Sequence, residues 1–118
     1  MNIIFGRENA QALEEKYTIL ELDTIRIGDN EITAFCAIET VPIVEMPRLP
    51  SMKALHDNLI LEYRKRNWNY CIQAMEHLLG FWNHELDTFY ENLRGRINEY
   101  IESEPDSDWD GVIVKQLS

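Results

Sequence analysis

The sequence predicts an α+β fold: a small antiparallel sheet built on a β-hairpin (about 17–39), packed with an antiparallel helical unit of two to three helices (51–102). Apolar and polar residues alternate along 31–39, a pattern typical of a half-buried strand. Beyond position 51, apolar residues recur every three or four positions, as on the buried face of a helix. Three prolines between 42 and 50 separate the two patterns and are expected to form an extended connector.

The chain has 118 residues, of which 45% are hydrophobic and 27% charged, a composition typical of globular proteins. A chain of this length is expected to form one compact core, so we predict a single domain spanning 1–118. Within it, 1–47 is mainly β, 51–102 is helical and 103–118 is an acidic tail.

The N-terminal region is expected to begin with a short strand over 3–5, which Gly6 ends. Residues 9–16 suit a short helix or turn. Towards the other end of the chain, the apolar residues 112–114 are predicted to add an edge strand or to pack on the core.

The β-hairpin within 17–39 is predicted to turn at 28–30, where glycine, aspartate and asparagine tolerate a positive φ. Along its first strand, the apolar face changes between Leu20 and Ile25. This change predicts either burial on both faces of the strand or a β-bulge near Thr24.

Small and polar residues mark the expected helix boundaries. Ser51 is predicted to cap the first helix, Asn67 the second and Asn83 the third. Gly80 is expected to interrupt the second helix or end it early, and Pro105 marks the end of the third. The apolar positions expected to face the core are Met52, Leu55, Leu59, Ile60 and Tyr63; Trp68, Ile72, Met75, Leu79 and Trp82; and Leu86, Tyr90, Leu93, Ile97 and Ile101.

Eleven basic against 21 acidic residues give the chain a formal net charge of −10. This charge argues against DNA, RNA or an anionic membrane as a partner, because binding them depends on neutralising negative groups. Five acids occupy alternate positions near the C-terminus: Glu102, Glu104, Asp106, Asp108 and Asp110. The preferred interpretation is a solvated tail. The alternative is an acidic nucleic-acid mimic that inhibits a DNA-binding protein, since an extended chain would present these carboxylates about 6.6 Å apart.

Cys36 and Cys71 lie within apolar runs and form no CxxC pair, so they are predicted to be buried thiols in a reducing cytoplasm. A disulfide between them would require the strand and the helix that carry them to touch. Residues 1–5 are too short an apolar run for a signal peptide, and the uncharged stretch 67–75 is too short for a membrane span. We therefore expect a soluble cytoplasmic protein.

The motifs that would carry catalysis or bind a metal are incomplete. Residues 84–88 begin like the HExxH motif of zinc proteases, but Thr88 stands in place of the second histidine. His77 and His84 would share one helix face if the helix continued through Gly80, which leaves a metal site as an alternative. The sequence contains neither a GxSxG nor a GxGxxG motif. We therefore expect no catalytic residue, no metal, no cofactor and no enzymatic activity; a small enzyme or metal-binding protein is the third hypothesis.

Three cations and two aromatic residues follow the first predicted helix: Arg64, Lys65, Arg66, Trp68 and Tyr70. Such interleaving occurs in nucleic-acid contacts, but the net charge of the chain favours an acidic peptide or protein as the partner. The structural alternative is that the cations oppose the negative end of a helix dipole. We select these five residues as the candidate partner-binding site of a non-catalytic protein-interaction module, acting alone or as a homodimer. Tyr70 and Phe81 would mark a partner or self-association surface if both are exposed.

Seven residues lie where a tetratricopeptide-type helical hairpin places its packing residues: Tyr63, Asn67, Trp68, Cys71, Ile72, Met75 and Leu78. The segment resembles a single degenerate tetratricopeptide-like hairpin, although Leu59 stands where that family has a small residue. Because a solenoid needs three or more such units, the resemblance implies the geometry of a hairpin and no function.

A second resemblance covers most of the chain, through 1–6, 17–24, 34–39, 55–56, 63–71 and 85–90. These segments resemble a family of small uncharacterised proteins from tailed phages of marine cyanobacteria and from marine metagenomes. The family carries no known activity, so the resemblance implies no catalytic residues. It implies a phage accessory protein that acts by binding host or viral proteins.

Overall fold

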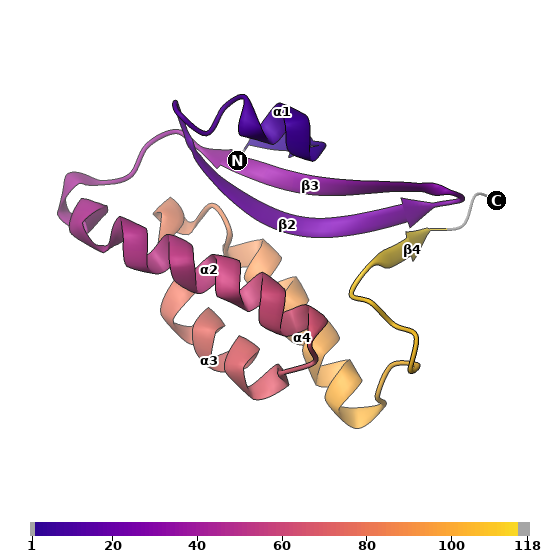
Figure 1. The fold of residues 1–118 in the computed structure, drawn as a ribbon. Coiled ribbons are helices and arrows are strands. Elements are labelled where there is room, and N and C mark those ends of the chain that lie inside the picture. Colours follow the sequence, from indigo (N-terminus) through magenta and orange to yellow (C-terminus); the bar gives the residue numbers. More distant parts are fainter. Residues whose placement is uncertain (1, 116–118) are drawn as a thin grey trace. The chain divides into compact units, whose positions relative to one another are not determined.

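The computed structural model describes residues 2–115, which form two compact units (Figure 1). The first unit comprises residues 2–40 and 110–115, and the second comprises residues 41–109. All four strands belong to the first unit, and the three long helices belong to the second. The predicted α+β class is therefore confirmed.

The first unit contains a four-stranded sheet of order β1–β3–β2–β4 (Figure 1). Its strands are β1 (Asn2–Phe5), β2 (Thr18–Ile27), β3 (Asn30–Ile38) and β4 (Ile113–Lys115). β1 and β2 pair with β3 in antiparallel fashion, as predicted, whereas β4 runs parallel to β2. The sheet is therefore mixed, and the second unit supplies the long connection that a parallel pairing of β2 and β4 needs. The predicted edge strand near 112–114 is confirmed.

The hairpin of β2 and β3 has the predicted turn and the predicted bulge. Ile27 pairs with Asn30, which leaves a two-residue loop in which Gly28 supplies the positive φ of 60°. The register shifts by one residue between Glu21 and Thr24. Both expected explanations hold, because the strand has this β-bulge and is also buried on both faces at Ile19 and Leu20, which are 6% and 0% exposed.

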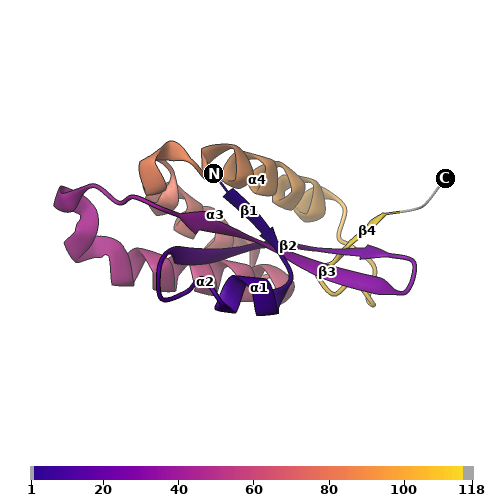
Figure 2. The same cartoon turned by 90° about the horizontal axis from the view of Figure 1, so that it is seen from above.

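The short helix α1 (Arg7–Gln11) covers one face of the sheet (Figures 1 and 2). Ala10 of this helix packs with Ile19, Phe35 and Ala37, and partly buried residues surround this cluster: Ile4, Leu13 and Tyr17. The expected helix or turn over 9–16 is found in part as each: the helix begins earlier, directly after Gly6, whose φ is 93°, and residues 12–16 form turns.

The second unit begins with a 3₁₀ helix, η1 (Ile43–Arg48), which continues into α2 (Leu49–Arg64). The predicted extended connector is therefore wrong, and so is the predicted cap at Ser51, which lies inside α2. Proline is compatible with the first turn of a helix because its missing N–H has no partner there. Pro50 occupies such a position in α2, and Pro47 lies within η1.

The second helix, α3 (Trp68–Leu78), ends just before Gly80. Of the two expected effects of Gly80, interruption of the helix or an early end, the structure has the early end. Asn83 does not cap a third helix. Instead, Trp82, Asn83 and His84 have φ values of 29°, 56° and 64° and form a left-handed turn, η2 (Trp82–His84). The helix α4 (Asp87–Glu102) begins three residues later than predicted, with Leu86 at its N-cap.

Buried side chains of the second unit come mainly from α2, α3 and α4: Met52, Leu59, Ile60, Tyr63, Cys71, Ala74, Met75, Leu78, Phe81, Trp82, Leu86, Tyr90, Leu93 and Ile97. Most of the predicted core positions are confirmed. The exceptions are Leu55, Trp68 and Ile72, which are only half-buried, and Leu79 and Ile101, which are 37% and 51% exposed. Leu78 is buried in place of Leu79, so the buried face of α3 is rotated by one residue from the predicted face.

A buried histidine also belongs to this unit. The Tyr90 hydroxyl accepts a hydrogen bond from the Trp82 indole N–H at 2.9 Å and shares a second with Nδ1 of His56, also at 2.9 Å. All three side chains are nearly or fully inaccessible to solvent. A single hydroxyl thus bonds one polar atom of each of two other buried side chains.

Within residues 2–115, the helices are all too short or too polar to cross a membrane.

Candidate partner-binding site

The turn between α2 and α3 carries the predicted cations. The N–H of Arg66 donates to the Tyr63 carbonyl at 3.1 Å, and the N–H of Asn67 donates to the Glu62 carbonyl at 3.0 Å. These two bonds define a Schellman motif, in which the residue after the helix end takes a left-handed conformation. Arg66 occupies that position with a φ of 64°, where glycine is the usual residue. The chain thus holds a long cationic side chain at a place that favours glycine.

The guanidinium of Arg66 binds the segment that follows α4. It donates from Nη1 to the carbonyl oxygen of Pro105 at 3.1 Å and from Nη2 to the carbonyl oxygen of Asp106. A longer ion pair, 3.9 Å between Nη1 and Oε1, joins it to the exposed Glu104. Arg66 therefore binds two consecutive main-chain carbonyls, a contact that does not depend on the side chains of the bound segment.

An aromatic cluster lies beside this contact: Tyr63, Trp68, Tyr100 and Trp109. The ring centroid of Trp109 is 5.3 Å from Tyr63, 5.7 Å from Trp68 and 5.3 Å from Tyr100. The guanidinium carbon of Arg66 lies 5.4 Å from the centre of the Trp109 ring, within the range of a cation–π interaction. Trp109 is thus held by three rings from α2, α3 and α4 and by one cation.

Residues 104–109, which we call the acidic segment, are therefore anchored to the helices of the second unit. The carboxylate side chains of Glu104, Asp106 and Asp108 are exposed, as a solvated tail requires, but the backbone and Trp109 are bound. The interpretation of this stretch as a purely solvated tail is corrected accordingly. Of the predicted tail 103–118, residues 116–118 lie outside the part of the chain that the structure describes.

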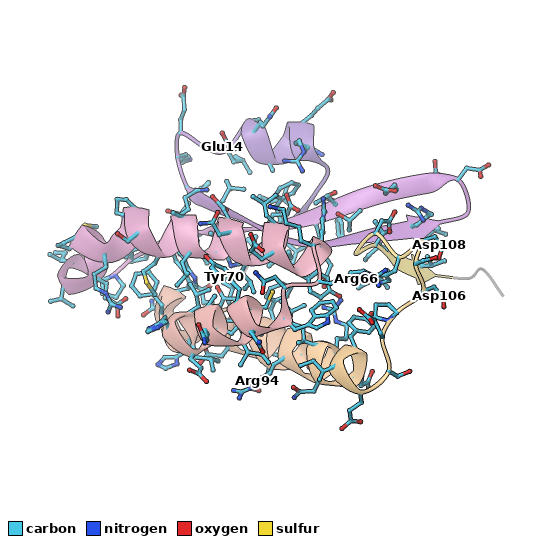
Figure 3. All side chains as sticks on the ribbon, turned by 60° about the horizontal axis from the view of Figure 1, so that its bottom comes forward. Glu14, Arg66, Tyr70, Arg94, Asp106 and Asp108 are labelled. Atoms are coloured by element: carbon cyan, nitrogen blue, oxygen red, sulfur yellow. The ribbon has the colours of Figure 1, made fainter. Side chains whose placement is uncertain are left out.

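The five predicted site residues divide into two groups. Arg66, with 23% of its side chain exposed, and Trp68, half-buried, take part in binding the acidic segment. Lys65, with 68% exposed, and Arg64 lie on the surface of the same turn, and Tyr70 is half-buried on α3. Nζ of Lys65 is 3.7 Å from Oε1 of Glu62, one turn back on α2. Figure 3 shows Arg66 directed towards Asp106, whereas Arg94 projects from the outer side of α4.

The condition for a shared Tyr70 and Phe81 surface is not met. Phe81 is only 4% exposed, because its ring packs against that of Trp82 at 4.7 Å and lies under the guanidinium of Arg48 at 5.5 Å. Since Tyr70 is also only half-exposed, the conditional expectation of a partner surface at these two residues does not apply.

The acidic residues 102–110 do not form an evenly spaced row. Glu102 is the last residue of α4, and the N–H of Trp109 donates to the carbonyl of Asp106 at 3.0 Å, so the chain turns at 106–109. Asp110 accepts hydrogen bonds from the Arg26 side chain at 2.9 Å and from the Val112 N–H at 3.1 Å, and these two bonds lower the pKa of its carboxyl. The regular carboxylate spacing on which the nucleic-acid mimic depends is absent from this part of the described chain.

His77 and His84 are both exposed, and the left-handed turn separates them. Nδ1 of His84 lies 2.8 Å from Oδ2 of Asp87, whose Oδ1 accepts the Gly80 N–H, also at 2.8 Å. Burial of Asp87 would raise the pKa of its carboxyl, but these two contacts lower it below its ordinary value. The contacts close the loop before α4. Within the described residues, no three His, Cys, Asp or Glu side chains lie close enough together to hold a metal ion.

Both cysteines are buried, as predicted, and neither forms a disulfide within residues 2–115. Burial, together with the nearby charge of Glu62, raises the pKa of the Cys71 thiol to about 12. Such a thiol is almost entirely protonated at neutral pH, and Cys71 packs in the core of the second unit, fully buried.

Trp109, Tyr100 and His56 were not among the residues predicted from the sequence to form a site. The signal for Trp109 was available, since a single large aromatic residue in a run of acids is expected to find an apolar partner. His56 gave no comparable signal, because a histidine beside Leu55 and Leu59 fits the edge of a helix stripe as well as its centre.

Comparisons with protein-family models, curated proteins and solved structures found no match to this chain.

Proposed function

We propose that this chain is a non-catalytic protein-interaction module whose binding site is the turn between α2 and α3. The observation that supports it is that this turn already binds a peptide segment of acidic character, in the form of residues 104–109. The segment is recognised by main-chain hydrogen bonds, a cation–π contact and aromatic packing. Each of these interactions is equally available to a segment of another protein.

The charge of the site also favours an acidic partner. Arg64 and Lys65 are exposed next to Arg66, so three consecutive cations lie at one turn of a chain whose net charge is −10. Opposite charges across an interface accelerate association and select the partner. The phage accessory role that the sequence resemblance implies would be exercised through such a contact with a host or viral protein.

The test reverses the two exposed cations and leaves Arg66 in place, because Arg66 also anchors the acidic segment. Tagged wild-type protein, Arg64→Glu/Lys65→Glu and the control Arg94→Glu are used to capture proteins, and the affinity for each captured protein is then measured. The double variant is expected to lose about tenfold in affinity, which corresponds to about 1.4 kcal/mol, and the wild-type affinity is expected to fall with rising salt. Arg94 is an exposed arginine on α4 that projects away from the acidic segment (Figure 3), so its variant should bind like the wild type. Equal affinities for all three proteins would rule out this turn as the binding site.

A further inference from the structure

We propose that the turn between α2 and α3, with the rings of Tyr63, Trp68 and Tyr100, recognises acidic segments that contain a tryptophan, and that residues 104–109 are its built-in competitor. This inference deepens the proposed function and rests on it. It identifies the chemical class of the ligand and the reason why the site of the isolated chain is occupied.

The class of ligand follows from the bound acidic segment. The guanidinium of Arg66 donates hydrogen bonds to two main-chain carbonyls. Any peptide offers such carbonyls, so these hydrogen bonds alone select no sequence. Selection comes from Trp109, whose ring lies within 5.7 Å of three other rings. The guanidinium carbon of Arg66 also lies 5.4 Å from the centre of the Trp109 ring. Tryptophan has the strongest cation–π attraction of the aromatic side chains, which makes it the preferred anchor at this position.

The acidic character of the ligand follows from the surrounding charges. Glu104 lies five positions before Trp109 and pairs with Arg66, while Asp106 and Asp108 are exposed between them. Arg64 and Lys65 precede Arg66 and are exposed, so the charge of this turn favours a ligand with carboxylates near its tryptophan. A basic segment would be repelled at the same place.

Competition follows from connectivity. The acidic segment is attached to α4, which ends at Glu102, and to β4, which begins at Ile113. Attachment to α4, which belongs to the same unit as the site, keeps the segment close to it, at an effective concentration on the order of 1 mM. Trp109 is only half-buried, and the segment contains no helix or strand, so its release breaks neither α4 nor β4. A ligand in solution must therefore displace a neighbour that is always present.

The experiment measures binding of a fluorescein-labelled synthetic peptide with the sequence of residues 103–110 to the full-length protein, by fluorescence anisotropy. Trp109→Ala removes the anchor of the built-in competitor and leaves Arg66 and the other three rings in place. This variant is expected to bind the peptide at least about tenfold more tightly than the wild type does. The same peptide with alanine in place of its tryptophan is expected to lose about tenfold in affinity for the variant.

Two further variants serve as controls. Phe5→Ala removes an aromatic side chain that is 58% exposed on β1, outside the second unit, and should bind the peptide like the wild type. Glu104→Lys/Asp108→Lys weakens the built-in competitor through two exposed side chains, so the fold is retained and all four rings remain. It is expected to increase peptide affinity by several-fold. Far-ultraviolet circular dichroism verifies that each variant is folded.

Equal peptide affinity of the wild type, Trp109→Ala and Glu104→Lys/Asp108→Lys would overturn the competition. Equal affinity for the peptides with and without tryptophan would overturn the ligand class. A wild-type dimer that exchanges its acidic segments, detected by light scattering after size exclusion, would overturn a competitor acting within one chain. The proposed function fails separately, if reversal of Arg64 and Lys65 leaves the capture of partners unchanged.

Discussion

Replacement of Tyr90 by phenylalanine tests the buried polar chain of the second unit. The substitution removes one hydroxyl oxygen and leaves the ring, so it opens almost no cavity. It removes the acceptor of the Trp82 N–H and the hydroxyl that bonds Nδ1 of His56. Trp82 is 1% exposed and His56 is 0% exposed, so water does not replace these bonds without local opening.

The expected loss of stability follows from these two bonds. A buried donor left without an acceptor costs about 1–3 kcal/mol, and loss of a further buried hydrogen bond costs about 1 kcal/mol. Tyr90→Phe should therefore lower the free energy of unfolding by about 2–4 kcal/mol. The matched control is Tyr70→Phe, the same chemical change at a half-buried tyrosine on α3, where the expected effect is within about 0.5 kcal/mol.

Urea unfolding followed by circular dichroism measures both variants, and the slope m should remain unchanged. The indole N–H of Trp82 provides a second readout, since its exchange with solvent deuterons should accelerate at least about tenfold in Tyr90→Phe. If Tyr90→Phe and Tyr70→Phe differ by less than about 1 kcal/mol, the shared hydroxyl does not stabilise the fold and the reasoning fails.

Three further substitutions or reactions test local features of the second unit. Arg66→Gly should be about 1 kcal/mol more stable in urea than Arg66→Ala, because both lose the guanidinium and only glycine relieves the left-handed φ; equal values would contradict the Schellman geometry. Asp87→Asn should weaken the acid dependence of stability. Burial would raise the pKa of the Asp87 carboxyl, but hydrogen bonds from the Gly80 N–H and His84 lower it below 3.8. The carboxylate therefore stabilises the fold above about pH 4, and this stabilisation is lost as the pH falls through the lowered pKa. Acid titration by circular dichroism should show this, and an unchanged acid limb in the variant would argue against it. Cys71, with a thiol pKa of about 12, should be alkylated by iodoacetamide at pH 8 about a thousandfold more slowly in the folded than in the unfolded chain, as measured by mass spectrometry; comparable rates would show that the thiol is accessible.

Local signals predicted the features that depend on a few neighbouring residues. The turn at Gly28 follows from glycine's tolerance of a positive φ, and the bulge near Thr24 follows from a break in a period-two pattern. The end of α3 near Gly80 has the same origin. These features are fixed within a window of about ten residues, so the sequence contains all the information that they require.

The helix starts and the buried face of α3 were harder to predict, because one residue type suits two structures. Asn83 has the side chain of a helix cap, but asparagine also tolerates a left-handed φ, and the structure uses the second property. In α3, Cys71, Ile72, Leu78 and Leu79 are all apolar, so two faces fit the helical period equally well. Tertiary packing selects Cys71 and Leu78.

The sequence predicted which residue types form the candidate site, but it did not predict that residues 104–109 of the same chain occupy it. Arg66 and Trp68 were selected because basic and aromatic side chains together favour an acidic ligand. That ligand is present within the chain, more than thirty-five positions further along, at residues 104–109. Pairing over such a separation leaves no periodic signal, and the acids that surround Trp109 favoured the interpretation of a solvated tail.

The occupied site also limits what kind of partner can act on the wild-type protein. A segment that made only the contacts of residues 104–109 would have to exceed their effective concentration, on the order of 1 mM, to fill half of the sites. Ion pairs with the exposed Arg64 and Lys65 would add up to about 1 kcal/mol each, which lowers that concentration about thirtyfold at most. Charge alone therefore leaves the required concentration in the range of tens of micromolar. A partner that binds more tightly must bury apolar surface in addition to its tryptophan, so we expect a folded protein with a projecting acidic segment rather than a short acidic peptide.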